Sequence, residues 1–139
     1  MEQKDSYHYY RIGLEYFESG ELESALESFL RSSESEPHFK TCVRTAHVLR
    51  ELKRFEEADR FLEQAYRLNP KNDKTGIEYA ELMLKRGQTF PAKKILNDII
   101  RRNPTYGPAR RLLTELVNEN DFLKYEESVP VLKIQAEAS

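Results

Sequence analysis

The chain has 139 residues, of which 39% are hydrophobic and 33% are charged, and its formal net charge at pH 7 is −2. This length fits about one domain with a core of its own, and the small net charge argues against general binding to nucleic acid or to an anionic membrane surface. No apolar run approaches the roughly 18–20 residues that span a bilayer, and no basic patch followed by an apolar stretch opens the sequence, so we expect a cytoplasmic protein without a signal peptide.

Six amphipathic stretches follow one another along the chain as three pairs. In the first stretch of each pair, apolar or small residues recur at i, i+3, i+4 and i+7, which is the spacing of one face of an α-helix. In the second stretch, an alanine is followed by a large apolar residue and then, twelve residues after the alanine, by a proline. With a seventh stretch near the end, the expected helices are at about 6–19, 22–35, 39–52, 55–68, 73–86, 90–102 and 108–119.

Small residues are expected where the two helices of a pair cross. A glycine or alanine lets two backbones come close, and large side chains then pack around that point. Each pair ends at a proline, whose ring and missing N–H cannot continue a helix. The small residues are Gly13, Ala46 and Ala80 on the first helices and Ala25, Ala58 and Ala92 on the second helices, and the prolines are Pro37, Pro70 and Pro104.

This pattern resembles the tetratricopeptide repeat (TPR), a helix–turn–helix unit of about 34 residues. The resemblance implies an all-α, right-handed superhelical solenoid of three repeats, at about 6–38, 39–72 and 73–106. Besides the small residues and prolines above, the matching positions are Tyr9, Cys42 and Gly76, then Ile12, Thr45 and Tyr79, then Tyr16, Leu49 and Met83, and finally Phe29, Leu62 and Leu96.

The C-terminal part departs from the repeat pattern. A helix at 107–119, with leucines on one side, suits the cap that a solenoid needs over its last apolar face. The domain is therefore expected to cover residues 1–119, followed by a short tail at 120–139. Within this tail, a final helical turn is expected around 122–125.

No motif in the sequence indicates catalysis. There is no Gly-rich phosphate loop and no pair of metal ligands on a helix. The three histidines, His8, His38 and His47, lack the spacing of metal ligands, and Cys42 is expected to be an inert core thiol. We therefore expect neither an enzyme nor a bound cofactor or metal.

Charge is distributed unevenly along the chain. Residues 1–38 carry three basic and nine acidic residues, a net charge of −6, whereas 39–72 and 73–106 each carry +3. Residues 107–139 carry −2. An acidic end beside a basic middle is expected to steer a partner or to favour head-to-tail association.

The first helix carries a second apolar stripe, formed by Tyr7, Tyr10, Leu14 and Phe17. A helix that is apolar on two faces must bury both or present one to a partner. The TPR resemblance places this stripe in the concave groove of the solenoid, where a peptide would bind. From the later repeats and the cap, it adds Val43, His47, Arg50, Lys74, Ile77, Glu81, Leu84 and Arg111.

The best-known ligand device of TPR proteins is a clamp for the terminal carboxylates of heat-shock chaperones. It needs Lys and Asn on the first helix, Asn on the third, and Lys and Arg on the fifth. The matching residues here are Tyr10, Leu14, Arg44, Lys74 and Glu78. Only Lys74 fits, and Glu78 would repel an anion, so the resemblance does not extend to this clamp and disfavours a heat-shock co-chaperone.

These observations predict a non-catalytic interaction module that binds a peptide or helix of a protein partner, as an adaptor, scaffold or chaperone. Neither nucleic acid nor a membrane is an expected partner. The alternative is a self-associating structural protein, a homo-oligomer whose groove is filled by a second copy. The chain's own tail is a further candidate, with Val131 and Leu132 covering Phe17.

Overall fold

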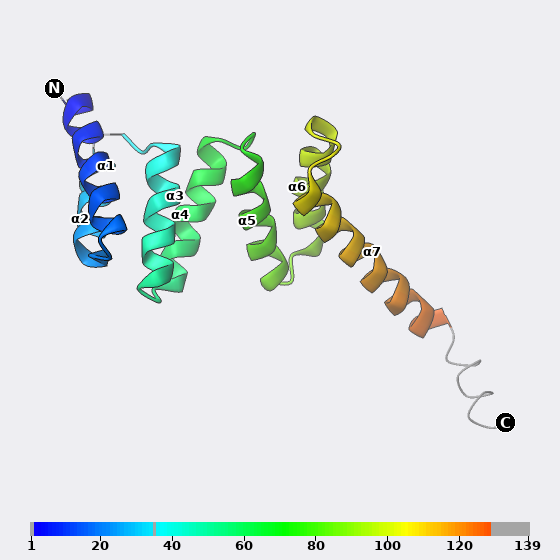
Figure 1. Ribbon diagram of the computed structural model, residues 1–139. Coiled ribbons are helices and arrows are strands. Elements are labelled where there is room, and N and C mark those ends of the chain that lie inside the picture. Colours follow the sequence, from blue (N-terminus) through cyan, green and yellow to red (C-terminus); the bar gives the residue numbers. More distant parts are fainter. Residues whose placement is uncertain (1, 35, 129–139) are drawn as a thin grey trace.

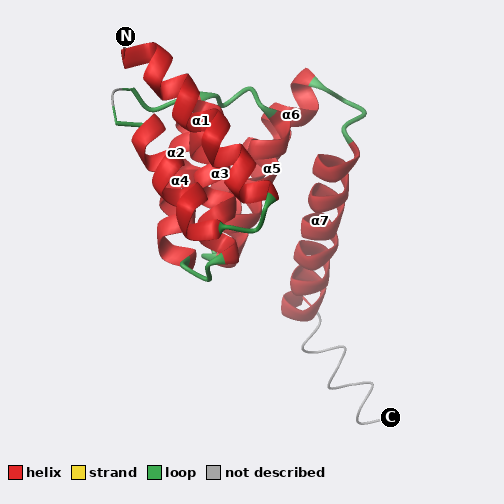
Figure 2. Ribbon diagram, turned by 60° about the vertical axis from the view of Figure 1, so that its left-hand side comes forward, coloured by secondary structure: helices red, strands yellow, loops and turns green. Residues whose placement is uncertain are grey.

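The computed structural model describes residues 2–34 and 36–128, and side chains within 5–34 and 36–118. In these residues the chain forms helices joined by short turns, and no strand (Figures 1 and 2). The helices are α1 (Glu2–Glu18), α2 (Leu22–Ser32), α3 (Phe39–Glu51), α4 (Phe55–Leu68), α5 (Asp73–Lys85), α6 (Thr89–Arg102) and α7 (Gly107–Ser128).

The helices pack as three successive pairs and a last helix. The pairs are α1 with α2, α3 with α4, and α5 with α6, and neighbouring pairs meet through α2–α3 and α4–α5 contacts. The last helix, α7, packs on α6. Figure 1 shows the pairs side by side in one row, with α7 at the far end running away from the stack. The predicted all-α solenoid is confirmed.

The small residues lie where the helices of a pair approach each other, as predicted. The alanines at these positions, including Ala25 and Ala58, are fully buried. A Cβ atom added to Gly13 would lie 2.6 Å from Cδ1 of Phe29, which is itself fully buried. Phe29 therefore occupies the space that the missing side chain of Gly13 leaves on α1.

The turn inside each pair has the same backbone conformation. Gly20, Lys53 and Gly87 follow α1, α3 and α5, and they have φ angles of 79°, 63° and 74°. This left-handed conformation commonly ends a helix and suits glycine best, because it has no Cβ. The second repeat places a lysine there, so its turn carries strain that the turns of the first and third repeats avoid.

The buried side chains form two clusters rather than one. The first cluster comprises Ala25, Leu26, Phe29, Val48, Leu49 and Ala58. The second extends from Ala46 and Leu62 through α5 and α6 to Ala109 and Leu116 of α7. The half-buried ring of Phe61 packs against both. The boundary between the clusters therefore passes through the second helix pair.

Polar contacts join the ends of the helices in the first and third pairs. Ser6 Oγ donates to the carbonyl oxygen of Ser32 at 2.6 Å, and Ser32 Oγ donates to that of Ser6 at 2.7 Å. In the third pair, Arg102 Nη2 lies 3.2 Å from Asp73 Oδ1. These contacts fix the N-terminus of each first helix to the C-terminus of its partner.

Three helix ends differ from the prediction by three residues or more, and the others lie within one residue of it. The first helix begins at Glu2, and α2 already ends at Ser32. There the hydroxyl of Ser32 bonds to α1. Pro37 follows, and it disfavours the helical conformation for the residue before it, Glu36. The last helix passes the predicted end at 119 and continues to Ser128, because no glycine or proline interrupts 109–128. Residues 129–139, including Val131 and Leu132, lie outside the described structure.

Candidate functional site

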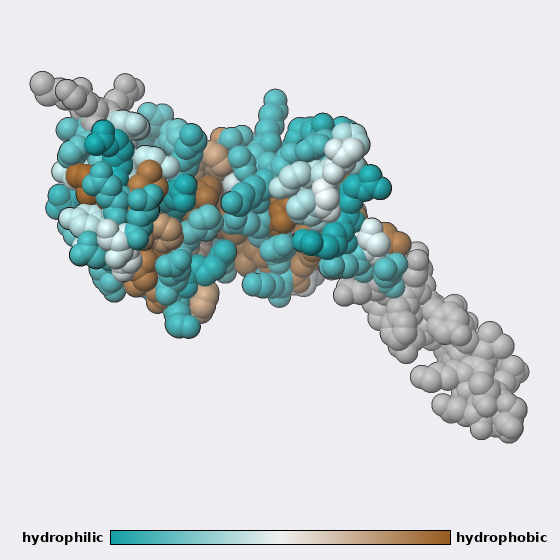
Figure 3. Space-filling view, in the orientation of Figure 1, coloured by the Kyte–Doolittle hydropathy of each residue, from teal (hydrophilic) through white to brown (hydrophobic). Residues whose placement is uncertain are grey.

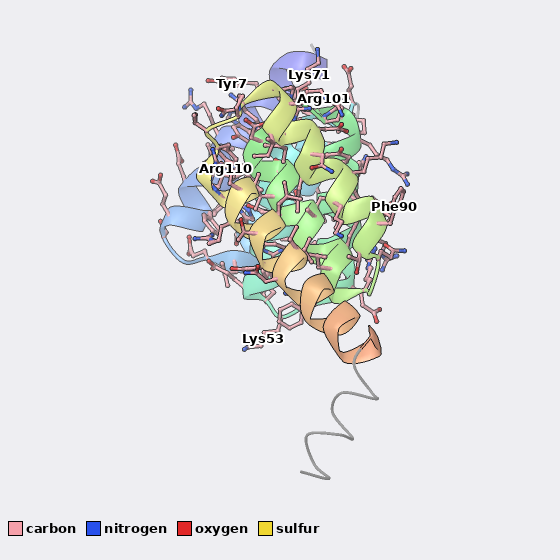
Figure 4. All side chains as sticks on the ribbon, turned by 90° about the vertical axis from the view of Figure 1, so that its right-hand side faces the viewer. Tyr7, Lys53, Lys71, Phe90, Arg101 and Arg110 are labelled. Carbon is pink, nitrogen blue, oxygen red and sulfur yellow. The ribbon has the colours of Figure 1, made fainter. Side chains whose placement is uncertain are left out.

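The predicted groove residues lie on the first helices of the pairs, α1, α3 and α5, and on α7. We call the surface that they form the first-helix face. In the view along the stack in Figure 4, Tyr7 of α1 and Arg110 of α7 lie toward one side, and Phe90 of the second helix α6 points to the other. The two sides of the solenoid therefore carry different helices and different side chains.

On α1 the apolar stripe is only partly open to solvent. Tyr7 is 65% exposed, whereas Tyr10, Leu14 and Phe17 are half-buried and pack against the first core cluster. The ring of Tyr10 lies 5.9 Å from that of Phe29. The stripe therefore helps to hold the first repeat together, and it still leaves part of each side chain available for contact.

On α3 and α5 the centre of the first-helix face is a contact between a histidine and a glutamate. His47 Nε2 lies 3.4 Å from Glu78 Oε2, and this contact bridges the second and third repeats. Both side chains are partly buried. The histidine was predicted as a groove residue, and the glutamate as a residue that would repel an anionic ligand. The structure shows that the two satisfy each other.

The environment of Glu78 favours its charged form. The hydrogen bond from His47 lowers the pKa of the Glu78 carboxyl below its usual range, against the opposing effect of burial. The positive charges of His47, Arg50 and Lys74 lower this pKa further. Three cationic or potentially cationic groups thus surround one carboxylate at the middle of the first-helix face.

The other predicted residues divide into exposed and supporting positions. Ile77 is only 8% exposed and belongs to the second core cluster, so it supports the face from below. Leu84 is half-buried against the same cluster, and Val43 is also half-buried. The residues that are open to solvent are charged: Arg50, Lys74, Glu81 and Arg111.

The surface around these helices is mixed rather than broadly apolar. In Figure 3, apolar atoms reach the surface in separate areas among hydrophilic side chains, over α1–α4 and between α4 and α5. Isolated apolar areas of this kind are normal for a folded protein. The potential binding surface therefore combines small apolar areas with charge.

The contact between His47 and Glu78 was missed at the level of sequence. Its signal is the spacing of 31 residues, one repeat less about one helical turn. This contact shows that residues about one repeat apart meet across α3 and α5. A search for oppositely charged or hydrogen-bonding residues at this spacing would have found His47 and Glu78.

We predict that Glu78→Gln reduces stability in a pH-dependent way. The folded-state pKa of Glu78 is lowered, so its contribution is present above the ordinary glutamate value of about 4.3 and is lost as the pH falls through the lower folded value. At pH 7 the variant should lose about 0.5–1 kcal/mol of unfolding free energy. Urea unfolding at neutral and strongly acidic pH measures this, and the difference should vanish at the acidic end.

The matched control for this prediction is Glu81→Gln, one turn along α5. Glu81 is exposed and makes no hydrogen bond or ion pair within the described side chains. Its substitution should change the unfolding free energy by less than about 0.5 kcal/mol. Equal effects of the two substitutions would contradict a specific role for the contact with His47.

In the described residues the metal-ligating side chains are dispersed, and the one thiol is buried. No group of three or more His, Cys, Asp or Glu side chains that could hold a metal ion occurs in the part searched. Burial raises the pKa of the Cys42 thiol to about 11, which keeps it protonated at neutral pH. No helix among the described residues has the length and apolar content that crossing a membrane requires.

Comparison with protein families gives two matches, both described as tetratricopeptide repeat. One covers residues 9–39 and the other covers residues 49–116. The chain belongs to the tetratricopeptide repeat family. Proteins of this family are generally non-catalytic interaction modules. A comparison with curated protein sequences gives no significant match.

Solved TPR structures share the fold of this TPR chain at low sequence identity. The first TPR domain of Spaghetti (RPAP3), bound to the HSP90 peptide SRMEEVD, superposes with a TM-score of 0.67 at 18% identity, covering 86% of this chain and 95% of that domain. The second TPR domain of human RPAP3, in complex with an HSP70 peptide, gives 0.61 at 19% identity, covering 83% and 94%.

A third similar structure is the Hsp90 co-chaperone Cns1 from Saccharomyces cerevisiae. It gives a TM-score of 0.68 at 17% identity and covers 99% of this chain but only 46% of its own. This TPR chain therefore spans less than half of that structure. At sequence identities this low, structural similarity establishes the fold. It does not show that this chain binds what the similar proteins bind.

Proposed function

We propose that this TPR chain binds a segment of a partner protein along the first-helix face, as an adaptor, scaffold or chaperone. Support comes from the family, whose members generally act as interaction modules, and from similar structures that hold chaperone peptides. The observation that carries the proposal is the composition of the face. Half-buried aromatic and aliphatic side chains on α1 lie beside a cationic region on α3 and α5.

The charges on this face favour a ligand with acidic residues near an apolar anchor. Arg50 and Lys74 are exposed and lie close enough to Glu78 to lower its pKa. Glu78 already neutralises part of this cationic region. A carboxylate of the ligand would therefore pair with the outer groups, Arg50 and Lys74, rather than enter the contact between His47 and Glu78.

The ligand need not carry the terminal carboxylates that the clamp of other TPR proteins requires. Four of the five positions of that clamp hold other residues here, and Tyr10 and Leu14 stand at two of them. These two side chains are half-buried on the first core cluster. They offer an apolar contact to an internal segment of a partner, either an extended peptide or one face of a helix.

We predict that Tyr7→Ala and Arg50→Glu both weaken partner binding, the first through the dissociation rate and the second through the association rate. Tyr7 is the most exposed aromatic residue on this face, and its truncation should cost up to about tenfold in affinity by faster dissociation. Reversing Arg50 should mainly slow association and reduce its salt dependence. Affinity capture from native lysate identifies the partner, and surface plasmon resonance with that purified partner measures both rates.

The control for Arg50→Glu is Arg101→Glu, the same charge reversal on α6. Arg101 is exposed and lies on a second helix (Figure 4). Its substitution should leave both rate constants unchanged. A partner whose binding is indifferent to Tyr7→Ala and Arg50→Glu would refute binding on the first-helix face. Concentration-dependent dimers that the same two substitutions abolish would favour self-association through this face.

A further inference from the structure

A second surface, at the N-terminal end of the solenoid, lacks the covering that its counterparts have. It consists of Tyr9, Ile12 and Tyr16 on α1, together with Arg31 on α2, and we call it the N-terminal face. Tyr9 and Ile12 are half-buried, and Tyr16 is 36% exposed. Side chains of this size and character are usually found packed in a repeat.

The same positions in the later repeats are covered by the preceding second helix. In α3 they are Cys42, Thr45 and Leu49, which are all at most 1% exposed. Leu49 shares the first core cluster with Ala25, Leu26 and Phe29 of α2. In the third repeat, the ring of Tyr79 lies 4.8 Å from that of Tyr66 on α4. Among residues 2–128, no helix occupies the corresponding place on α1.

Arg31 gives this face a partial, polar cover. Its guanidinium lies 5.6 Å from the centre of the Tyr9 ring, and its Nη2 lies 3.3 Å from Glu27 Oε1. The remaining charges beside the stripe on α1 are mainly acidic, with Asp5 and Glu15 exposed. A helix that docks here would meet apolar rings flanked by carboxylates.

Within the described side chains, the second helices of a second folded copy have no free apolar side to place on this face. The apolar sides of its later second helices are already used, since Ala58, Leu62 and Ala65 of α4 are at most 1% exposed. In α6, Ala92 and Ile95 are at most 7% exposed. On α7, Leu116 is equally buried. These observations favour an occupant from a different protein.

We propose that the N-terminal face binds an amphipathic α-helix of a partner protein, packed as the second helix of a preceding repeat would be. Its apolar stripe should contain a small residue, which lets the helix approach α1 as Ala25 and Ala58 do within the chain. Its flanks should carry lysine or arginine, which pair with Asp5, Glu15 and Glu27. This surface is separate from the first-helix face, and binding at one does not depend on binding at the other.

The probe for this proposal is a synthetic peptide with the sequence of residues 88–103, which is α6 with one residue added at each end. It has the apolar stripe of a second helix and four basic residues, Lys93, Lys94, Arg101 and Arg102. The control peptide has glutamate at these four positions. Fluorescence anisotropy with the full chain should show saturable binding of the basic peptide below about 1 mM and at least about tenfold weaker binding of the control.

Substitutions in the protein locate the binding site. Tyr16→Glu should lower the affinity for the basic peptide by at least about tenfold. Tyr7→Glu, on the first-helix face, should change this affinity by less than about twofold. Glu15→Lys provides a second variant at an exposed position, and it should weaken binding of the same peptide several-fold through charge.

Three results would overturn the proposal. One is the absence of binding up to about 1 mM peptide. Another is binding that Tyr16→Glu and Glu15→Lys leave unchanged, since the peptide would then occupy some other site, such as that of α6 itself. The third is a dimer of the chain, seen by sedimentation, that Tyr16→Glu abolishes, because the occupant of the face would then be a second copy.

Discussion

Phe29→Ala should destabilise the protein by about 3–5 kcal/mol, the usual cost of removing a fully buried aromatic side chain. Phe29 is fully buried in the first core cluster, where it faces Gly13 of α1 and the ring of Tyr10. Since whole domains are stable by only about 5–15 kcal/mol, this loss is expected to unfold the first repeat. Urea unfolding monitored by circular dichroism measures it.

The adjacent residue on α2 provides the control for this substitution. Leu30 has a side chain of comparable character but is 42% exposed. Leu30→Ala removes a similar apolar group from the same helix, and it should cost no more than about 1 kcal/mol. If both substitutions had the same small effect, Phe29 could not be the centre of the first cluster.

Gly13→Ala should destabilise by about 1–3 kcal/mol although alanine is the better helix former. Helix propensity alone favours the alanine by about 1 kcal/mol. Its Cβ, however, would lie 2.6 Å from two atoms of the Phe29 ring, which has no room to move. Overpacking a core contact typically destabilises the fold by more than the higher helix propensity of alanine stabilises it.

Gly76→Ala tests the same substitution where the contact is looser. The added Cβ would lie 3.0 Å from Cδ1 of Ile99, the far end of a flexible side chain. This variant should be neutral or slightly stabilising. Combining Gly13→Ala with Phe29→Leu should recover part of the loss expected from the two single substitutions, because the smaller side chain makes room. A stabilising Gly13→Ala, or strictly additive effects, would contradict the predicted contact.

The spacing of small residues in the sequence predicted the fold well, because each of these residues is required by the close packing of two helices. Gly13, Ala25 and Ala58 are needed wherever two backbones approach closely, so their recurrence reports packing directly. The ends of α2 and α7 were predicted less well. The end of α2 involves a hydrogen bond between Ser32 and Ser6, 26 residues apart, and no local pattern reveals such a contact.

The candidate site was harder to predict because position on a helix face does not give burial. Tyr10 and Phe17 were predicted to line a groove, yet they also pack on the first core cluster. Ile77 occupies an equivalent place and is buried, since its neighbours in the third repeat close over it. How much of each side chain remains free depends on contacts between repeats, which periodicity within one repeat does not describe.

We expect the two core clusters to act as two cooperative units during unfolding. In a linear array each unit is stabilised by its neighbours, and the end units open first. The first-helix face crosses the border between these units, since α1 packs on the first cluster and Leu84 of α5 on the second. A bound segment that spans both would tie their opening together, so that amide hydrogen exchange would slow in both units, including at residues that the ligand does not touch.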